Sequence, residues 1–288
     1  MVAAPGDPIS RPMNALRDTL ADRLRGMVGS GEGALDLTRP PGDDGLFGPH
    51  SAAWKVHGDF TSMMIGGTSA LLLQMLHPGA LGGVWDHSDF RENMGGRLKR
   101  TAQFVAGTTY GSTATATRLI AKVRRIHDHV TGILPDGTPY AANDPALLTW
   151  VHVGEARSFL AAYMRYRDPG FPAARQEQYH REMAVLARAM GAGDVPATRA
   201  DVEGYFHDMR PRLLVDDRTR SAARALLEQP AAAGMAAAQR LLLGAGVELL
   251  PPWAARMHGL SIPALARPAI RAGARGTAGV LRWALAAR

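Results

Sequence analysis

Apolar residues recur at spacings of three, four and seven along most of the chain, and strictly alternating stretches are nearly absent. The first spacing is typical of one face of an α-helix, whereas alternation is typical of a strand. The pattern predicts helices at about 13–27, 59–76, 94–107, 113–131, 143–167, 172–190, 199–210, 217–228 and 233–249. Two short strands are expected only beside the turn-rich segment "LPDGTPY" (134–140). We therefore expect an all-α, single-domain helical bundle with at most one short hairpin.

Local signals place several helix ends. Asp59 is expected to cap the helix that runs to Leu76 and stops at "HPG". Gly132 is expected to close the helix over 113–131. Thr198, followed three residues later by a carboxylate, predicts the start of a helix at 199.

Composition narrows the classes of protein and of site. The chain has 288 residues, 46% of them hydrophobic, which is enough for a sizeable core. Cysteine is absent, which excludes disulfides, thiolate zinc sites, iron–sulfur clusters and cysteine nucleophiles. The N-terminus lacks a signal-peptide pattern, and the longest mostly apolar run, 63–76, is too short to span a bilayer. We expect a soluble, cytoplasmic protein.

The net charge of +7 is concentrated near the C-terminus. No acidic residue follows Glu248, whereas six arginines do: Arg256, Arg267, Arg271, Arg275, Arg282 and Arg288. Such a tail could make a peripheral contact with an anionic lipid surface, although a solvated arginine face is the simpler interpretation. No nucleic-acid motif accompanies it, so we expect no nucleic-acid partner.

Two histidines lie two positions apart in "KVRRIHDHVTG" (122–132). His127 follows Val123 by four and precedes Val130 by three, so it shares their apolar stripe. His129 lies about 200° further round the helix, among the basic residues. Burial of an imidazole on an apolar stripe is costly unless its nitrogens find partners. His127 is therefore the stronger candidate for chemistry, and His129 is predicted to lie on the surface.

Other polar residues also stand beside apolar surroundings. His152 shares the apolar face of its helix with Phe159, His77 ends an apolar helix, and His87 lies in "WDHSDF". Each one alone is more simply a hydrogen-bonded core histidine, but together they favour a histidine-ligated site, such as iron or haem. Arg97 and Thr101 are one turn apart, where an arginine can hold a carboxylate or simply cover a helix surface.

Several stretches, taken in order, resemble a known family. They are "WKVHGD", "LLLQMLHPGALGGVWDHSDF", "GRLKRT", "VRRIHDHVTG", "YAANDPALLTWVH" and "LLPPWAARMHGL". They resemble the haem-dependent oxygenases that include bacterial latex-clearing proteins (rubber oxygenases) and the fungal oxygenase that shortens the prenyl side chain in mycophenolic acid biosynthesis. The resemblance covers roughly residues 50–260. It implies an all-α fold around a haem b pocket, with residues 1–48 as an N-terminal helix and arm, 49–260 as the catalytic domain and 261–288 as a basic helical tail packed on it.

The resemblance also implies roles for particular residues. The family motif "H-x-x-V-x-G" falls on His127, which would be the axial iron ligand and donate its other N–H to an acceptor. Arg97 and Thr101 match the family's arginine and threonine, spaced by four, which would lie near the haem and the reacting oxygen, and Asp86 is the best match for the family's acidic residue. His77 and His152 complete the candidate cofactor-binding set with His127 and Arg97. A lysine can cap the iron in rubber oxygenases, but here an arginine directly precedes Thr101.

The implied activity is oxygenation of a small apolar molecule, with an electron-rich C=C bond as the target, by dioxygen at haem iron. A non-catalytic helical haem- or lipid-binding protein is one alternative. A di-iron carboxylate oxygenase is another, but it needs two Glu-x-x-His motifs, and only Glu177–His180 fits clearly. The zinc-protease motif HExxH is absent.

Overall fold

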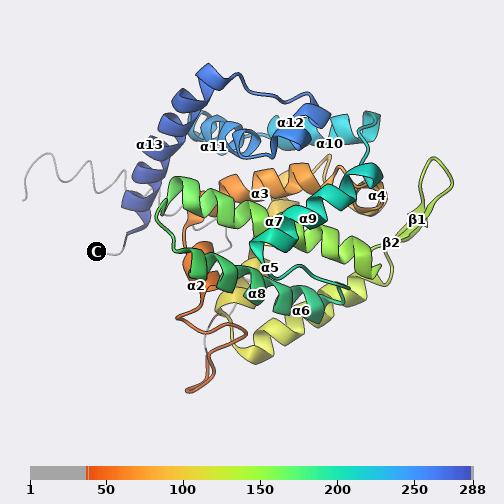
Figure 1. The fold of residues 1–288 in the computed structure, drawn as a ribbon, viewed down its shortest axis with the longest axis horizontal. Helices are drawn as coiled ribbons and strands as arrows, with labels where there is room; N and C mark the ends of the chain where they lie inside the picture. The colour runs from red at the N-terminus through yellow and green to blue at the C-terminus, as the bar shows by residue number, and fades with distance from the viewer. Residues whose placement is uncertain (1–36, 38, 287–288) are drawn as a thin grey trace, which may run out of the picture.

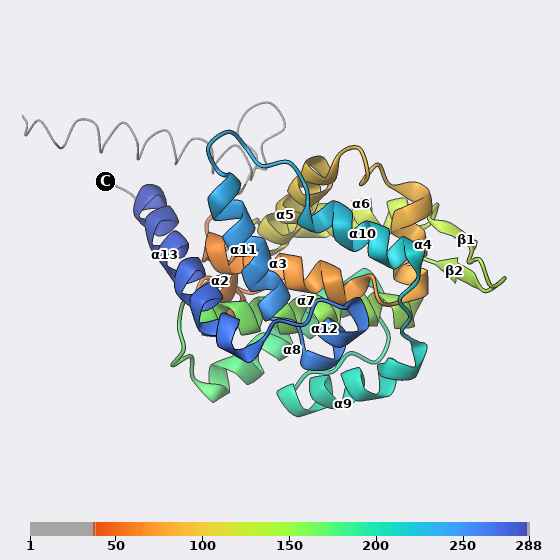
Figure 2. The same ribbon diagram turned by 90° about the horizontal axis from the view of Figure 1, so that it is seen from above.

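The computed structural model describes residue 37 and residues 39–286, and these are built almost entirely from helices (Figures 1 and 2). In chain order the elements are α2 (Ala52–His57), α3 (Phe60–Gln74), α4 (Pro78–His87), α5 (Met94–Tyr110), α6 (Thr113–His127), β1 (Thr131–Ile133), β2 (Pro139–Ala141), α7 (Pro145–Tyr166), α8 (Ala173–Met190), α9 (Arg199–Met209), η1 (Arg210–Arg212), α10 (Asp217–Leu227), α11 (Ala236–Glu248), α12 (Pro252–His258), η2 (Ala264–Ala266) and α13 (Arg267–Leu285). The all-α fold with one short hairpin is confirmed. The helix predicted at 13–27 lies outside the described residues.

The bundle is organised around α3, which carries apolar or small residues on every face. Such a helix must be covered on all sides. Helix α7 packs along it, α11 covers another side, and α2 and α13 make smaller contacts (Figures 1 and 2). A Cβ on Gly66 would lie 2.9 Å from Cδ1 of Phe159, so the close approach of α3 and α7 requires glycine at this position.

Helix starts follow the capping signals in the sequence. The Asp59 side chain accepts a hydrogen bond from the N–H of Ser62 at the start of α3, and Thr198 accepts one from the N–H of Asp201 at the start of α9. Asp144 caps α7, whose first residue is a proline. These side chains satisfy N–H groups that have no partner within the helix. The predicted starts of all three helices are confirmed.

The prediction of one helix over 113–131 is wrong at its C-terminal end. Helix α6 ends at His127, because the chain turns there and Thr131 begins strand β1. Gly132 pairs with Tyr140 across the hairpin and does not close a helix. A Cβ at Gly132 would lie 2.5 Å from the phenolic oxygen of Tyr140, so this glycine is needed for the close approach of a ring.

The "HPG" segment ends one helix and begins another. Helix α3 stops before His77 as predicted, but α4 starts directly at Pro78, which the apolar spacing did not reveal. A proline is tolerated at the first position of a helix because its missing N–H would have no partner there. Nδ1 of His77 accepts a hydrogen bond from the N–H of Gly79, so His77 is the N-cap of α4.

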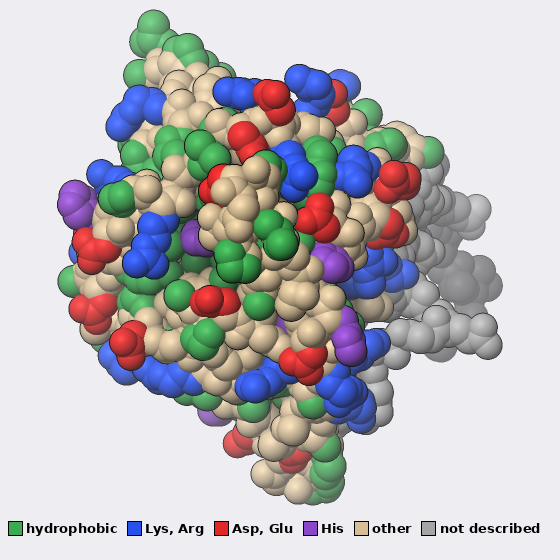
Figure 3. All heavy atoms as spheres, turned by 90° about the vertical axis from the view of Figure 1, so that its right-hand side faces the viewer, with side chains coloured by type: hydrophobic (Ala, Val, Ile, Leu, Met, Phe, Trp, Pro, Cys, Tyr) green, Lys and Arg blue, Asp and Glu red, His purple; other side chains and the backbone are tan. Residues whose placement is uncertain are grey.

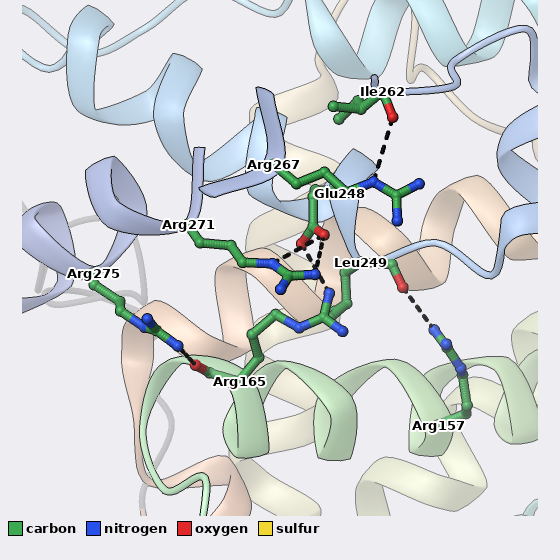
Figure 4. Close-up of polar contacts among 8 residues, drawn as sticks. All are labelled: Arg157, Arg165, Glu248, Leu249, Ile262, Arg267, Arg271 and Arg275. Carbon is green, nitrogen blue, oxygen red and sulfur yellow. Dashed lines mark hydrogen bonds and ion pairs between the residues drawn. The ribbon is translucent and has the colours of Figure 1, made fainter. Parts of the chain in front are cut away.

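The basic C-terminal segment folds back on the bundle as α13. The side chain of Glu248 is only 1% exposed and accepts hydrogen bonds from Arg165 at 2.8 Å and from Arg271 at 2.6 Å (Figure 4). Arg282 forms an ion pair with Asp59 at the start of α3. Hydrogen bonds from Arg282 and Ser62 lower the pKa of Asp59, although burial opposes this. Some arginines of the basic tail therefore fasten α13 to the core.

Replacing Glu248 with glutamine is expected to lower the free energy of unfolding by about 1–3 kcal/mol, because the two arginines lose a buried partner. This loss is smaller than for a fully buried ion pair. The side chains of Arg165 and Arg271 are 33% and 36% exposed, so water can solvate their charges in the variant. Urea denaturation at pH 7 measures it. Glu92→Gln makes the same chemical change at an exposed position and should leave the midpoint in place. Equal midpoints for both variants would contradict this role of Glu248.

Charged side chains of both signs lie on the face that bears the hairpin. In Figure 3 basic and acidic side chains are interspersed over this face and do not separate by sign. A nucleic-acid surface usually presents a basic patch or stripe. No described helix has the length and apolar character needed to cross a membrane.

Candidate functional site

His127 and His129 lie in different environments, as the helical stripe predicts. His127 is the last residue of α6 and is half-buried, whereas His129 is exposed. Nδ1 of His127 is buried without a hydrogen-bond partner, and Nε2 makes no hydrogen bond with any described residue. Burial lowers the pKa of His127. The ring is therefore neutral near pH 7, which is the form that binds a metal ion.

His152 and Glu155 lie one turn apart on α7. Their side chains are 10% and 22% exposed, and Nδ1 of His152 lies 4.0 Å from Oε2 of Glu155. Burial lowers the pKa of His152 to about 4, and nearby His127 adds to this. Burial raises the pKa of Glu155 to about 7, against the opposing effects of Gln74 and Arg97. Glu155 is therefore divided between its charged and neutral forms near pH 7.

Helices α3 and α5 bring a donor and a cation to the same place. Nε2 of Gln74 donates a hydrogen bond to Oε1 of Glu155 at 3.2 Å. Arg97 interacts electrostatically with Glu155, and burial together with the neighbouring Arg100 lowers the pKa of Arg97. Its guanidinium makes no hydrogen bond or ion pair with any described residue. A desolvated guanidinium of this kind can bind a carboxylate or another anion.

One hydrogen bond, from Gln74 to Glu155, one close pair, His152 with Glu155, and the electrostatic interactions of Arg97 and His127 with that pair link a group that we call the central polar cluster. Its members come from four helices and are Gln74, Arg97, His127, His152 and Glu155. The sequence predicted Arg97, His127 and His152 as cofactor-binding residues, and the structure places all three in this one neighbourhood.

The first three quarters of α5 do not contribute buried side chains. None of residues 94–106 is buried, although Leu98 and Phe104 are apolar. Helix α5 packs mainly on α6 and α2, and Leu98 meets the core that α3 and α7 share with α9, α10 and α12 only as a partly buried side chain. Leu71 and Val151 are also partly buried there. The central polar cluster is thus bordered by accessible apolar surface, which suits a mainly apolar ligand.

Thr101 lies one turn after Arg97 on α5, as the spacing predicts. Its hydroxyl donates a hydrogen bond to the backbone carbonyl of Arg97 at 3.3 Å, which leaves its oxygen free to accept. Arg100 turns outward and pairs with Asp89 at 2.9 Å, with both side chains about half exposed. The residue directly before Thr101 is therefore used on the surface.

Asp86 and His77 contact groups other than the central polar cluster. Oδ2 of Asp86 accepts a hydrogen bond from the hydroxyl of Tyr140 at 2.6 Å, and Oδ1 lies 3.7 Å from Arg218. Arg218 lines a cavity of about 100 Å³ between α4, the hairpin and α10. His77 caps α4, and its ring centroid lies 6.2 Å from that of Trp150. Roles for Asp86 and His77 beside a cofactor stay predictions.

The Glu177–His180 motif lies on α8, outside the central polar cluster. Glu177, the acid of "EQYH", accepts a hydrogen bond from the N–H of Arg199, and His180 is buried. Within the part of the chain that the structure describes, no three His, Asp or Glu side chains group as they would around a bare metal ion. A haem iron needs as few as one protein ligand, because the porphyrin supplies four.

Comparisons with known proteins agree with this all-α architecture. The family described as "ER-bound oxygenase mpaB/B'/Rubber oxygenase, catalytic domain" matches residues 54–283. The chain therefore belongs to this oxygenase family, and the resemblance seen in its motifs is confirmed. Among solved structures, "Structure of Latex Clearing Protein LCP in the closed state" is 17% identical, with a TM-score of 0.55, and the match covers 96% of this chain and 85% of that one. At this identity the likeness shows a shared fold. Curated protein sequences give no significant match.

Sequence reasoning missed Glu155 and Gln74. Glu155 follows His152 by three and Leu148 by seven, so it stands on the apolar face of α7. A carboxylate there is unusual, since acidic residues are rarely buried without a partner. The position of an acidic residue on this apolar face was the signal in the sequence that could have identified Glu155. Gln74 carried none, because a polar residue at the end of an apolar helix is common.

Proposed function

We propose that this protein is a haem b-dependent oxygenase that uses dioxygen on a small, apolar, unsaturated molecule. Membership of the oxygenase family supports the reaction class. The observation that carries the haem assignment is His127, whose neutral ring is half-buried and leaves Nε2 without a hydrogen bond to any described residue. The family resemblance selects the same residue.

The residues around His127 fit a haem. Nε2 of His127 would hold the iron, and the guanidinium of Arg97, which pairs with no described residue, would suit a propionate carboxylate. Half-buried apolar side chains of α3, α5 and α7, such as Leu71, Leu98 and Val151, can cover the porphyrin or an apolar substrate. His152 adds a neutral imidazole to the same neighbourhood.

When bound, haem supplies the redox chemistry with dioxygen. The chain's own residues hold the anionic group, exclude water and handle protons. Two carboxylates are candidates for accepting a proton from the allylic carbon of a substrate. The resemblance indicates Asp86, whereas the surroundings favour Glu155, because Arg97 acts on it electrostatically and burial raises its pKa to about 7. The Thr101 hydroxyl can accept a hydrogen bond from a bound polar group.

The proposal is tested by expression of the full chain with a haem precursor, followed by absorption spectroscopy and oxygen electrode assays. A Soret band and oxygen consumption that depends on an added prenyl-type alkene, with a carbonyl product, are expected. A well-folded but colourless protein would overturn the haem assignment. A haem-loaded protein that consumes no oxygen with any alkene tested would instead indicate a haem carrier.

A further inference from the structure

The side chain of Asn143 is held in one orientation at the junction of hairpin and α7. Its Nδ2 donates hydrogen bonds to the backbone carbonyl of Arg124 at 3.1 Å and to Oδ1 of Asp128 at 2.5 Å. Both partners are acceptors, so the atom that faces them must be the amide nitrogen. The amide oxygen therefore points the other way. Oδ1 of Asn143 is buried and has no partner that meets the geometry of a hydrogen bond.

The second buried atom without such a partner in this region is Nδ1 of His127. The two side chains are neighbours, because a hydrogen-bond interaction with Asn143 raises the pKa of His127 against the larger, lowering effect of burial. Asp128, which holds Asn143, directly follows His127 at the end of α6. A buried N–H and a buried amide oxygen are each costly alone, and a hydrogen bond between them satisfies both.

We propose that Asn143 is the positioning residue for His127: its Oδ1 accepts the hydrogen on Nδ1, which fixes the ring tautomer and presents Nε2 as the iron ligand. This inference rests on the proposed function, since it takes haem iron as the occupant of Nε2. It goes further by assigning the ligating atom and its supporting partner.

The role has a physical consequence for the bound group. A ligating histidine that donates its other N–H is held in orientation and becomes a stronger electron donor, and loss of such a partner typically weakens metal binding about 10- to 100-fold. A stronger acceptor at position 143 should strengthen the iron–histidine bond, whereas removal of the acceptor should weaken it.

The tautomer can be tested without haem. In the haem-free full chain, labelled with ¹⁵N-histidine, the NMR signals of His127 are assigned by their loss in His127→Gln. We expect Nδ1 to carry the proton in the native sequence and Nε2 to carry it in Asn143→Leu. An Nε2-protonated ring in the native sequence would overturn the inference, and this readout holds whether or not haem binds.

The haem-loaded protein provides the second test. Resonance Raman spectra of the ferrous form should show the iron–histidine stretching frequency shifted upward in Asn143→Asp and downward in Asn143→Leu. The reduction potential should move in opposite directions in the same two variants. A merely structural role would shift both variants the same way, and that result would overturn the inference. If neither the native chain nor any variant binds haem, the proposed function is contradicted. The NMR measurement of the tautomer then decides whether Asn143 positions His127.

Discussion

His127→Ala is expected to bind haem more than ~100-fold more weakly than the native chain, because loss of even a supporting partner of a ligand weakens metal binding by about 10- to 100-fold. The residue is at the end of α6, and its ring is the one described imidazole with a buried nitrogen that lacks a hydrogen-bond partner. Haem titration followed by absorption, with far-UV circular dichroism as a check on folding, measures the effect.

The matched control is His129→Ala, two positions away in sequence but exposed on the surface. It should bind haem like the native chain. The smaller variant His127→Gly with added imidazole should regain the Soret band, which separates loss of a ligand from loss of the fold. Retention of haem by His127→Ala together with its loss in His129→Ala would show that the apolar stripe selected the wrong ring.

The fold could be predicted where local patterns determine it. Capping side chains such as Asp59 and Thr198 directly precede the helices that they start, so these helix starts could be predicted. The end of α6 was not, because it depends on the pairing of Gly132 with Tyr140, eight positions away, and on a close ring contact that spacing does not reveal. Helix α4 was hidden for a different reason, since its first proline looked like a stop signal.

The candidate site was also predictable only where the signal lies within one helix. A single helix shows which side of it faces the core, and this is sufficient to choose His127 over His129. It does not show which helices meet, so the contact between Gln74 on α3 and Glu155 on α7 could not be derived. The partner of Asp86 also comes from a distant element, because Tyr140 lies on β2.

Glu155→Gln is expected to reduce the oxygenase turnover of the haem-loaded protein by about 10²- to 10⁴-fold, the usual contribution of general acid–base catalysis. Glutamine keeps the size and can still accept from Gln74, but it cannot take a proton from a substrate carbon. The native rate should rise with pH through the pKa of Glu155, and the residual rate of the variant should lose that dependence. Steady-state rates against pH measure both.

Asp86→Asn is the matched control, because it makes the same change at the carboxylate that contacts Tyr140. If Glu155 takes the proton, Asp86→Asn should keep the native pH profile. A normal rate in Glu155→Gln together with a large loss in Asp86→Asn would assign the proton to Asp86 instead. If both variants turn over near the native rate, neither carboxylate accepts the proton.

The raised pKa of Glu155 can be tested independently through the stability of the haem-free chain. Its folded pKa is raised from an ordinary value of 4.5 to about 7, so the folded chain holds this proton more tightly than the unfolded chain does. Stability should therefore fall as pH rises from about 4.5 to 7, by roughly 3 kcal/mol at most. Glutamine removes the charge that burial penalises, so Glu155→Gln should unfold at a higher temperature than the native chain at pH 8 and show no such gain at pH 4.5. If the two unfolding temperatures differ by the same amount at both pH values, the pKa of Glu155 is not raised in the folded chain. Glu155 would then lack the raised pKa that supports its role as a proton acceptor at neutral pH.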